Sequence, residues 1–569
     1  MALTDPVSSI VDDVVTQNIG FAPILRYYFE KAAIARLIDD SVPIDPRRKV
    51  LTHGQAAVAM ITAILFQVMQ LYRICPFARQ STVLDTVLAG IPAEAYFDDR
   101  LADSLDALHR HGLGNLELEI TRHMIEAWQI STDVCHNDTT SASYYGNGNT
   151  AASSEGIQIT FGHSKKHRDD LKQLIWSMSV SDDSAFPLFS QAYSGNTADV
   201  TTYVEQWQRL IDLLDRSDFL YVADCKLISA ANIAAILDNG GHFLAPAPMY
   251  ECFAKHFEAA VADHDREILL PHKRRFNRGF EVPLVVRHLK KDYRLRMIII
   301  FDQAVAQTKR QNLKRRVEQT REALEALRGT LNGRKPKTEE QIQKACDAIL
   351  ATYGTANFFT YRIDYQALVT YKYKNRGRPS AGKPAEKVAV HSDLFDIQVH
   401  FDEATFSAAL DRCGYYPLLT DVEADNLSLQ QAMAHHKGQY RNEHTFRRAK
   451  GPYDLEPIYL QRPERIEAYL FLFKIALQIV VLVERTARIN IQQRDRGLDG
   501  FMPNRKDVRN PKAEHLLAAF EHVVKGAMPG PSGTTCGFVS KLTAVQNEII
   551  AVLEVPRECF SYKYLADSS

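Results

Sequence analysis

The sequence predicts an α/β core with a mixed sheet and helices, preceded by an all-α N-terminal domain and interrupted by a mainly β insertion that contains a long helix. Three observations support this prediction. Residues 1–129 show helical apolar spacing with few strand-like alternations, short strands begin near residue 130, and further strands surround a helix at 304–328. The expected parts of the chain are residues 1–129, 130–250, 251–411, 412–490 and a helical region at 491–569.

Two apolar stretches, residues 56–72 and 466–484, approach the length of a membrane-spanning helix. The first follows "LTHGQ", in which Thr52 and Gln55 have the spacing of a capping box. The second carries Lys474 and Gln478 in its middle. Both are therefore predicted to be core helices of a protein without a membrane partner.

Charge and cysteine usage restrict the class of protein. The chain has 68 Lys and Arg against 69 Asp and Glu, so a polyanion must be held by local basic patches. The eight cysteines form no C-x-x-C pair, and "MALTDPVSSIVDDVV" lacks the basic and apolar regions of a signal peptide. These features favour a reducing cytoplasm and argue against a zinc ribbon.

The core is predicted from the order of its elements. Short strands are expected in "STDVCHND", "GIQITFGHS", "QLIWSMSV" and "FPLFSQAYSGN". The helix "TTYVEQWQRLIDLLDRS" and an apolar strand ending at Asp224 follow, and Ser229 then caps the helix "AANIAAILDNGG". Three meandering strands, a helix and a parallel strand are the opening of a ribonuclease-H-like core.

The insertion is predicted to contain the strands "VPLVVRHL", "RLRMIIIF", "NFFTYRID" and "ALVTYKYK". Its long helix places apolar side chains at alternating spacings of four and three, typical of a helical hairpin or a short coiled coil. These residues are Leu313, Val317, Thr320, Leu324 and Leu327. "CGYYPLLTD" then returns to the sheet, and "SLQQAMAHHKGQYRNEHTFRRAKGPYDL" is expected to be a helix.

Three carboxylates are placed where functional groups gather. Asp138 and Asp224 are expected to end neighbouring strands, where ligand crevices of open α/β sheets lie. Glu443 shares one helix face with Phe446, Arg447 and Lys450. Three carboxylates suffice for a pair of Mg²⁺ ions that clamp the attacking and leaving oxygens of a phosphate. A single aspartate after a strand is more often a helix-capping or loop residue.

The chain resembles the DDE transposases of bacterial insertion sequences, specifically the insertion-sequence-four group. The resemblance rests on "HNDTTSASYYG", "GHSKKHRDDLKQLIWSMSV", "AYSGNTADVTT", "YVADCKLISAANIAAIL", "NEHTFRRAK" and "LEPIYLQRPERIEAYLFLFKIAL", and covers about residues 130–490. It implies a ribonuclease-H-like fold and two Mg²⁺ or Mn²⁺ ions on Asp138, Asp224 and Glu443. It also implies terminal inverted repeats and target DNA as partners, a homodimer in the active complex, and a nucleoid-associated bacterial protein of the cytoplasm.

The sequence departs from the family pattern around the glutamate. The family has Tyr and Arg seven and four residues before Glu443, whereas this chain has His436 and Gln439. In relatives those two residues contact phosphates near the cleaved end, so Tyr440 and Arg441 of the adjacent turn are candidates to replace them.

Other basic residues are candidates for DNA binding. Alongside Lys450 and Arg447, they are Lys165, Lys166 and Arg168 in "GHSKKHRDDLKQ", and Arg376 and Arg378 in "RGRP", which resembles an AT-hook core. The alternative for each is an exposed loop whose charges are solvated and do not contact DNA. The segments "DPRRK" and "RICPFARQ" of the N-terminal domain are expected to help recognise transposon ends.

The sequence thus predicts a transposase that hydrolyses DNA at the transposon ends and joins the freed 3′-hydroxyl to target DNA. Two alternatives remain open: a DNA-binding protein that has lost catalysis, and a ribonuclease-H-like nuclease without strand transfer.

Overall fold

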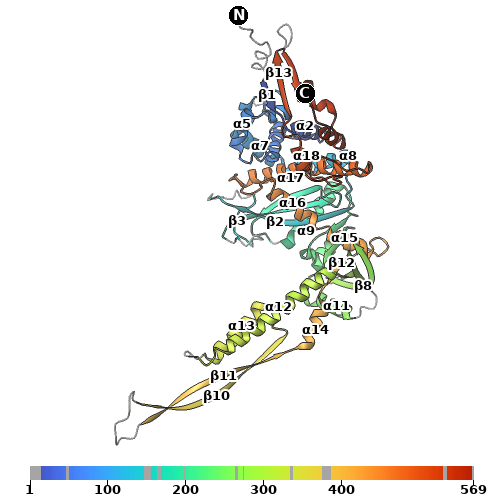
Figure 1. Cartoon of the computed structure of the whole chain (residues 1–569). Coiled ribbons are helices and arrows are strands. Elements are labelled where there is room, and N and C mark those ends of the chain that lie inside the picture. Colours follow the sequence, from blue (N-terminus) through green and yellow to red (C-terminus); the bar gives the residue numbers. More distant parts are fainter. Residues whose placement is uncertain are drawn as a thin grey trace. The chain divides into compact units, whose positions relative to one another are not determined.

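The computed structural model describes residues 15–45, 50–146, 156–162, 168, 170–197, 199–262, 267–272, 275–333, 337–374, 386–529 and 535–566. It is a mixed α/β fold with an N-terminal helical region (Figure 1). The chain divides into two compact units: Met1–Pro246, Leu284–Leu295 and Leu419–Ser569 form the first, and Ala247–Pro283 and Arg296–Leu418 form the second.

The first unit contains a mixed sheet with the strand order β4-β3-β2-β5-β6. Strands β3 and β4 extend it as an antiparallel meander from β2, whereas β5 and β6 run parallel to β2. The bounds are β2 (Val134–Tyr144), β3 (Lys172–Ser181), β4 (Pro187–Ser194), β5 (Leu220–Val222) and β6 (His242–Pro246). The strands expected in "QLIWSMSV" and "FPLFSQAYSGN" and the strand before Asp224 are confirmed.

Two predictions about these strands are wrong. Asp138 does not end a strand, because β2 continues through "TTSASY" in register with β3 as far as Tyr144. The strand expected at "GIQITFGHS" is reduced, within the described residues 156–162, to one bridge between Thr160 and Gln173.

Helices cover both faces of this sheet. Helix α9 (Asp199–Leu214) contacts β2 and β4, and α10 (Ala230–Asp238) contacts β6. Ser229 caps α10 by accepting a hydrogen bond from the backbone N–H of Asn232, as predicted. On the other face α16 (Tyr440–Lys450) contacts β2 and β3, and its Phe446 ring lies 6.0 Å from that of Trp176. The single helix expected around Glu443 is instead two, α15 (Leu429–Lys437) and α16, separated at Gly438.

The N-terminal part is mainly helical, with the capping box of Thr52 and Gln55 present at α4. Its helices are α2 (Ala22–Lys31), α3 (Ile34–Ser41), α4 (His53–Leu65), α5 (Leu71–Gln80), α6 (Val83–Val87), η2 (Ala93–Tyr96), α7 (Asp98–His111) and α8 (Leu113–Trp128).

The prediction of an all-α N-terminal domain is wrong at β1 (Val15–Asn18). This strand pairs antiparallel with β13 (Val524–Pro529), which pairs with β14 (Thr535–Val539). The C-terminal region therefore contributes a hairpin as well as its helices. Those helices are α18 (Ala513–Ala518), α19 (Ala544–Val552), η5 (Arg557–Phe560) and α20 (Tyr562–Ala566).

Helix α17 (Pro463–Gln493) is long and apolar enough to cross a membrane, but 94% of its most apolar window is buried inside the protein. It packs against α4, α7, α8 and β4, so it serves as a core helix. Its Lys474 ammonium lies 3.0 Å from the Glu117 carboxylate, and Gln478 donates to the Pro187 carbonyl at 2.8 Å. The Lys474 ammonium and the Gln478 side-chain nitrogen are thus paired within the core, whereas Oε1 of Gln478 finds no hydrogen-bond partner among the described residues.

The second unit contains a helical hairpin and a long two-stranded ribbon (Figure 1). Leu313 is half-buried and Val317, Thr320, Leu324 and Leu327 are buried, which confirms the predicted seam. The two strands expected in "NFFTYRID" and "ALVTYKYK" form one strand, β10. The bounds are α11 (Glu251–Ala262), β7 (Ile268–His272), β8 (Arg275–His288), β9 (Lys291–Phe301), α12 (Gln303–Arg328), α13 (Glu339–Tyr353), β10 (Phe359–Tyr373), β11 (Lys387–Phe401), α14 (Glu403–Arg412) and β12 (Tyr415–Thr420).

Candidate functional site

Asp138 lies within β2, and Asp224 lies two residues after the end of the adjacent parallel strand β5. Strand β2 pairs with β5 so that Cys135 lies opposite Tyr221 and His136 opposite Val222. Asp138 and Asp224 each lie two residues beyond the last pair of this register, His136 with Val222. Since neighbouring strands are about 4.8 Å apart, residues in register on one face lie side by side.

A buried tyrosine holds Asp224. The hydroxyl of Tyr203 donates to Oδ1 of Asp224 at 2.6 Å, and the backbone N–H of Lys226 donates to the same oxygen at 2.9 Å. Burial raises the pKa of Tyr203 far above its ordinary value, and the charges of Asp224 and Asp138 raise it further. Tyr203 therefore remains a neutral donor, and its sensitivity to both carboxylates agrees with their proximity.

Asp138 lies on the sheet face that α16 covers. Because side chains alternate along a strand, Asp138 shares its face with His136 and Thr140. The Lys450 ammonium at the end of α16 donates to the Thr140 hydroxyl at 2.7 Å and to the Ser141 carbonyl at 2.5 Å. Helix α16 therefore runs along the part of β2 that carries Asp138.

Glu443 is positioned by its buried neighbour Asn442. The Asn442 side-chain amide donates to the carbonyls of Met178 at 2.7 Å and His136 at 3.4 Å, which fastens the first turn of α16 to β3 and β2. Glu443 itself is exposed, as are Tyr440 and Arg447 on the same helix, whereas Phe446 faces the core.

Arg441 belongs to a half-buried charge cluster around Asp182. Its guanidinium lies 3.1 Å from the Asp182 carboxylate, which also contacts Nε2 of His136 at 2.8 Å. Burial acts to raise the pKa of Asp182, but the hydrogen bonds from His136 and His435 and the charge of Arg441 hold it far below its ordinary range. Burial lowers the pKa of His136, so its neutral ring donates from Nε2 to the carboxylate. The cluster ties the start of α16 to β2 and to the end of β3.

The remaining candidates are placed as follows. Arg168 is exposed and paired with Asp170 at 2.7 Å. Lys165, Lys166, Arg376 and Arg378 lie outside the described residues. The segment "RICPFARQ" is part of α5, and most of "DPRRK" also lies outside the described residues. Burial lowers the pKa of His436, which stands where the family has tyrosine, to about 4.

Two residues of this site were not identified from the sequence. Tyr203 and Asn442 are ordinary residues within their helices, and only the packing of α9 and α16 on the sheet shows what they contact. Among the residues that the structure describes, no three His, Cys, Asp or Glu side chains stand close enough together to hold a metal. Asp138, Asp224 and Glu443 therefore do not form a three-carboxylate cluster in this structure.

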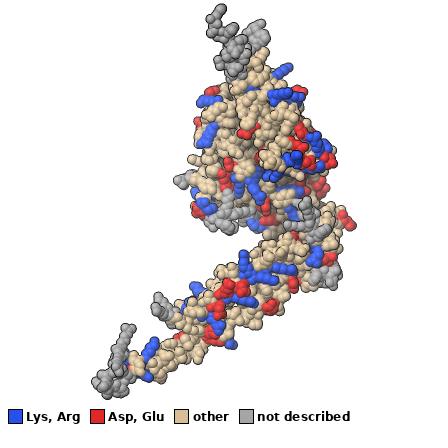
Figure 2. All heavy atoms as spheres, in the orientation of Figure 1, with Lys and Arg blue, Asp and Glu red and all other residues tan. Residues whose placement is uncertain are grey.

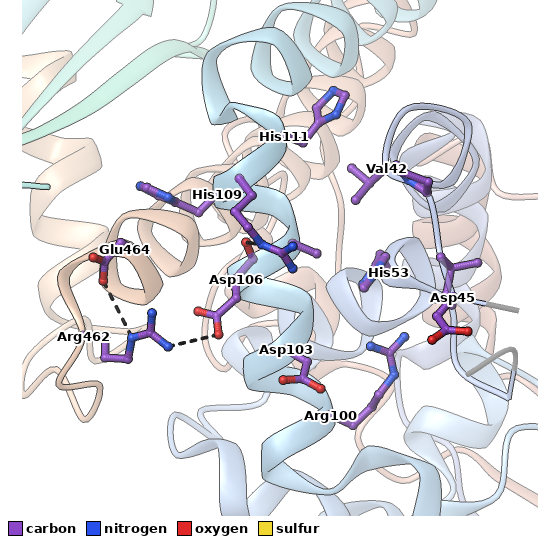
Figure 3. Close-up of a pocket in the computed structure, with 14 residues that line it drawn as sticks. Val42, Asp45, His53, Arg100, Asp103, Asp106, His109, His111, Arg462 and Glu464 are labelled. Carbon is purple, nitrogen blue, oxygen red and sulfur yellow. Dashed lines mark hydrogen bonds and ion pairs between the residues drawn. The ribbon is translucent and has the colours of Figure 1, made fainter. Parts of the chain in front are cut away.

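A polar cavity of about 700 Å³ lies elsewhere in the first unit, between α7, residues 42–45 and the start of α17 (Figure 3). Asp106 points into it and is paired with Arg462 at 3.3 Å and with Arg465 at 2.7 Å. None of the three candidate carboxylates lines this cavity, so it is distinct from the carboxylate site.

A family described as a domain of unknown function (DUF4277) matches residues 14–122, which include β1, α2–α7 and the first part of α8. No curated protein sequence matches the chain.

Proposed function

We propose that the chain is a DNA transposase of the DDE type with a ribonuclease-H-like core. The observation that carries this proposal is the parallel pairing of β2 and β5, after whose last pair, His136 with Val222, Asp138 and Asp224 each follow by two residues. The strand order β4-β3-β2-β5-β6, with an antiparallel meander on one side and parallel strands on the other, supports the proposed core. The resemblance of residues 130–490 to the insertion-sequence-four group agrees with both.

Asp138 and Asp224 are the residues we assign to hold Mg²⁺ or Mn²⁺, with Glu443 approaching from α16. Two neighbouring carboxylates repel one another, and a bound divalent cation would offset their charge. Bound metal would polarise a phosphate oxygen and activate water. Tyr203 keeps Asp224 oriented, and Asn442 keeps the Glu443 turn against the sheet.

The proposed reactions are two in-line phosphoryl transfers. Water attacks the phosphodiester at the transposon end and the P–O bond to the leaving strand breaks, which frees a 3′-hydroxyl. That hydroxyl then attacks a target phosphodiester, so one P–O bond forms as another breaks. Arg447 and Tyr440, exposed beside Glu443, are the side chains we assign to the DNA backbone near the cleaved end.

The test is cleavage and joining of a plasmid that carries the cognate terminal repeats, which are first identified by sequencing the DNA on either side of the gene. Asp138→Asn, Asp224→Asn and Glu443→Gln should retain fold and DNA affinity but lose cleavage in Mg²⁺ and Mn²⁺, since an amide keeps the shape and loses the charge. Asp133→Asn is the matched control, because Asp133 precedes the same strand and pairs with Arg216 at the surface. Cleavage by Asp224→Asn at the wild-type rate would refute the assignment.

The same assay separates the competing functions. Joined products from the wild-type chain support transposition. Cuts without joining indicate a nuclease, and specific binding without cuts indicates a DNA-binding protein that has lost catalysis.

A further inference from the structure

Only the first half of the β10–β11 ribbon packs against the helices α12 and α13. It pairs without interruption from Phe359 opposite Phe401 to Tyr373 opposite Lys387. Phe359 and Ile397 are buried in the cluster formed with α12 and α13. Figure 1 shows the ribbon continuing past the end of the α12–α13 hairpin.

The distal half of the ribbon exposes large apolar side chains on both faces. Val369, Tyr371 and Tyr373 are exposed, the two tyrosines by 68% and 62%. Tyr371 and Tyr373 lie on one face, and Leu368 and Val388 are exposed on the other. An isolated two-stranded ribbon is marginally stable in water at best, so apolar groups displayed on both faces indicate a surface that binds a partner.

The charge of the same segment selects the kind of partner. Between residues 365 and 395 the basic residues are Lys372, Lys374, Arg376, Arg378, Lys383 and Lys387, and the acidic residues are Glu386 and Asp393. In the part that the structure describes, the three lysines are exposed; Lys374 pairs with Glu386 at 3.0 Å and the Lys387 ammonium lies 5.3 Å from the Tyr373 ring centre. In Figure 2 the distal ribbon is mostly tan, with blue side chains close to the grey residues. This excess of positive charge repels a second copy of the same segment and attracts a polyanion.

We propose that the distal half of the ribbon, residues 365–374 with 386–395, is an arm that binds duplex DNA at a place separate from the carboxylates. A two-stranded ribbon has the width that a DNA groove accepts. Lysines would contact phosphates, and the tyrosine and aliphatic side chains would pack on sugars and base edges. The inference rests on the proposed function only in taking DNA as the polyanion.

The arm is tested by the salt dependence of DNA binding by the full chain. The variant Lys372→Gln/Lys374→Gln/Lys387→Gln is compared with Lys309→Gln/Lys314→Gln/Lys344→Gln, which removes the same charge from exposed positions of α12 and α13 in the same unit. The probe is a short blunt duplex of random sequence without metal ions, so that binding is read apart from cleavage. Each lost phosphate contact lowers the slope of log affinity against log salt by about 0.9, so the ribbon variant should lose about 2 to 3 of that slope. The control should keep the wild-type slope.

Three outcomes overturn the proposal. Equal slopes for wild type and the ribbon variant, or equal losses in both variants, would remove any special role of the ribbon.

The second experiment measures Leu368→Ser/Tyr371→Ser/Tyr373→Ser by analytical ultracentrifugation without DNA. If these three substitutions convert a dimer into a monomer and leave DNA affinity unchanged, the ribbon binds a second copy of the chain instead of DNA. Loss of DNA affinity without a change of mass supports the arm. Failure of the proposed catalysis is read separately, as absence of cleavage by a wild-type chain that still binds DNA.

Discussion

Substituting Lys474 by methionine should destabilise the first unit by about 3–5 kcal/mol. The Lys474 side chain is fully buried, pairs with the buried Glu117 carboxylate at 3.0 Å, and donates to the Thr121 hydroxyl at 2.7 Å. Methionine fills the space of the lysine stem but removes the charge, so Glu117 is left in the core without its cation. Removing one partner of a buried ion pair costs about 3–5 kcal/mol.

The pH dependence follows from the pKa of Glu117. Burial raises the pKa of this carboxyl, and Lys474 opposes the rise in the wild type. In Lys474→Met the folded-state pKa lies further above the unfolded-state value of about 4.3, so the folded state holds a proton that the unfolded state has lost. The stability that the variant loses relative to wild type should therefore be smallest below pH of about 4.3 and grow as pH rises from there towards the raised pKa.

The assay is urea unfolding followed by tryptophan fluorescence. Trp128, Trp176 and Trp207 are all buried in the first unit, so the signal reports that unit. The control is Lys474→Met/Glu117→Gln, whose amide oxygen can still accept the hydrogen bond that the Ser190 N–H donates to Glu117 at 2.8 Å. The double variant should recover to within about 1 kcal/mol of wild type, since replacing a whole buried pair is often nearly neutral. Unfolding of Lys474→Met at the wild-type urea midpoint at neutral pH would refute the reasoning.

Three further predictions follow from the packing. Tyr203→Phe removes a hydrogen bond to the Asp224 carboxylate, and a hydrogen bond to a charged acceptor is worth about 1.5–3 kcal/mol. The variant should cleave DNA about ten- to hundredfold more slowly at unchanged DNA affinity. An unaltered cleavage rate would contradict the role of Tyr203. Asn442→Ala leaves two strand carbonyls without their donor and should lower the free energy of unfolding by about 1–3 kcal/mol, measured by urea and contradicted by a wild-type midpoint. Leu324→Ala should lower the free energy of unfolding of the second unit by about 2–5 kcal/mol. The loss is measured as faster hydrogen exchange in α12 and α13. An equal shift of the urea transition followed by tryptophan fluorescence would show that the two units unfold together.

Local patterns in the sequence predicted many elements correctly. The strands β3 and β4, the helix α9, the cap at Ser229 and the capping box at α4 were all readable because each depends on apolar periodicity or on a side chain within four residues. The seam of α12 was readable for the same reason, since a spacing of four and three defines one helix face. The partner of that face was expected to be a helix of a hairpin or a coiled coil, but its position, α13 (Glu339–Tyr353), was not predicted.

The candidate carboxylates illustrate where sequence reasoning stops. The sequence singled out Asp138, Asp224 and Glu443, and it placed Asp224 correctly after its strand. It ended β2 at Asp138 because a charged residue is unusual inside a buried strand, whereas the pairing with β3 carries the strand on to Tyr144. It assigned Arg441 to DNA, whereas the fold brings Asp182 to it from the end of β3.

By itself the sequence determined the elements formed by neighbouring residues, the apolar faces they must bury and the local excess of positive charge at residues 365–395. Only the tertiary structure decided which distant groups meet: β1 with β13, Lys474 with Glu117, and Tyr203 with Asp224. The physical reason is that helix periodicity and capping are set by contacts within a few residues, whereas the partner of a buried charge or an unpaired strand edge is chosen by the packing of the whole unit. A strand edge at residue 15 can be satisfied by any strand the fold brings near, and here that strand lies more than 500 residues later in the chain.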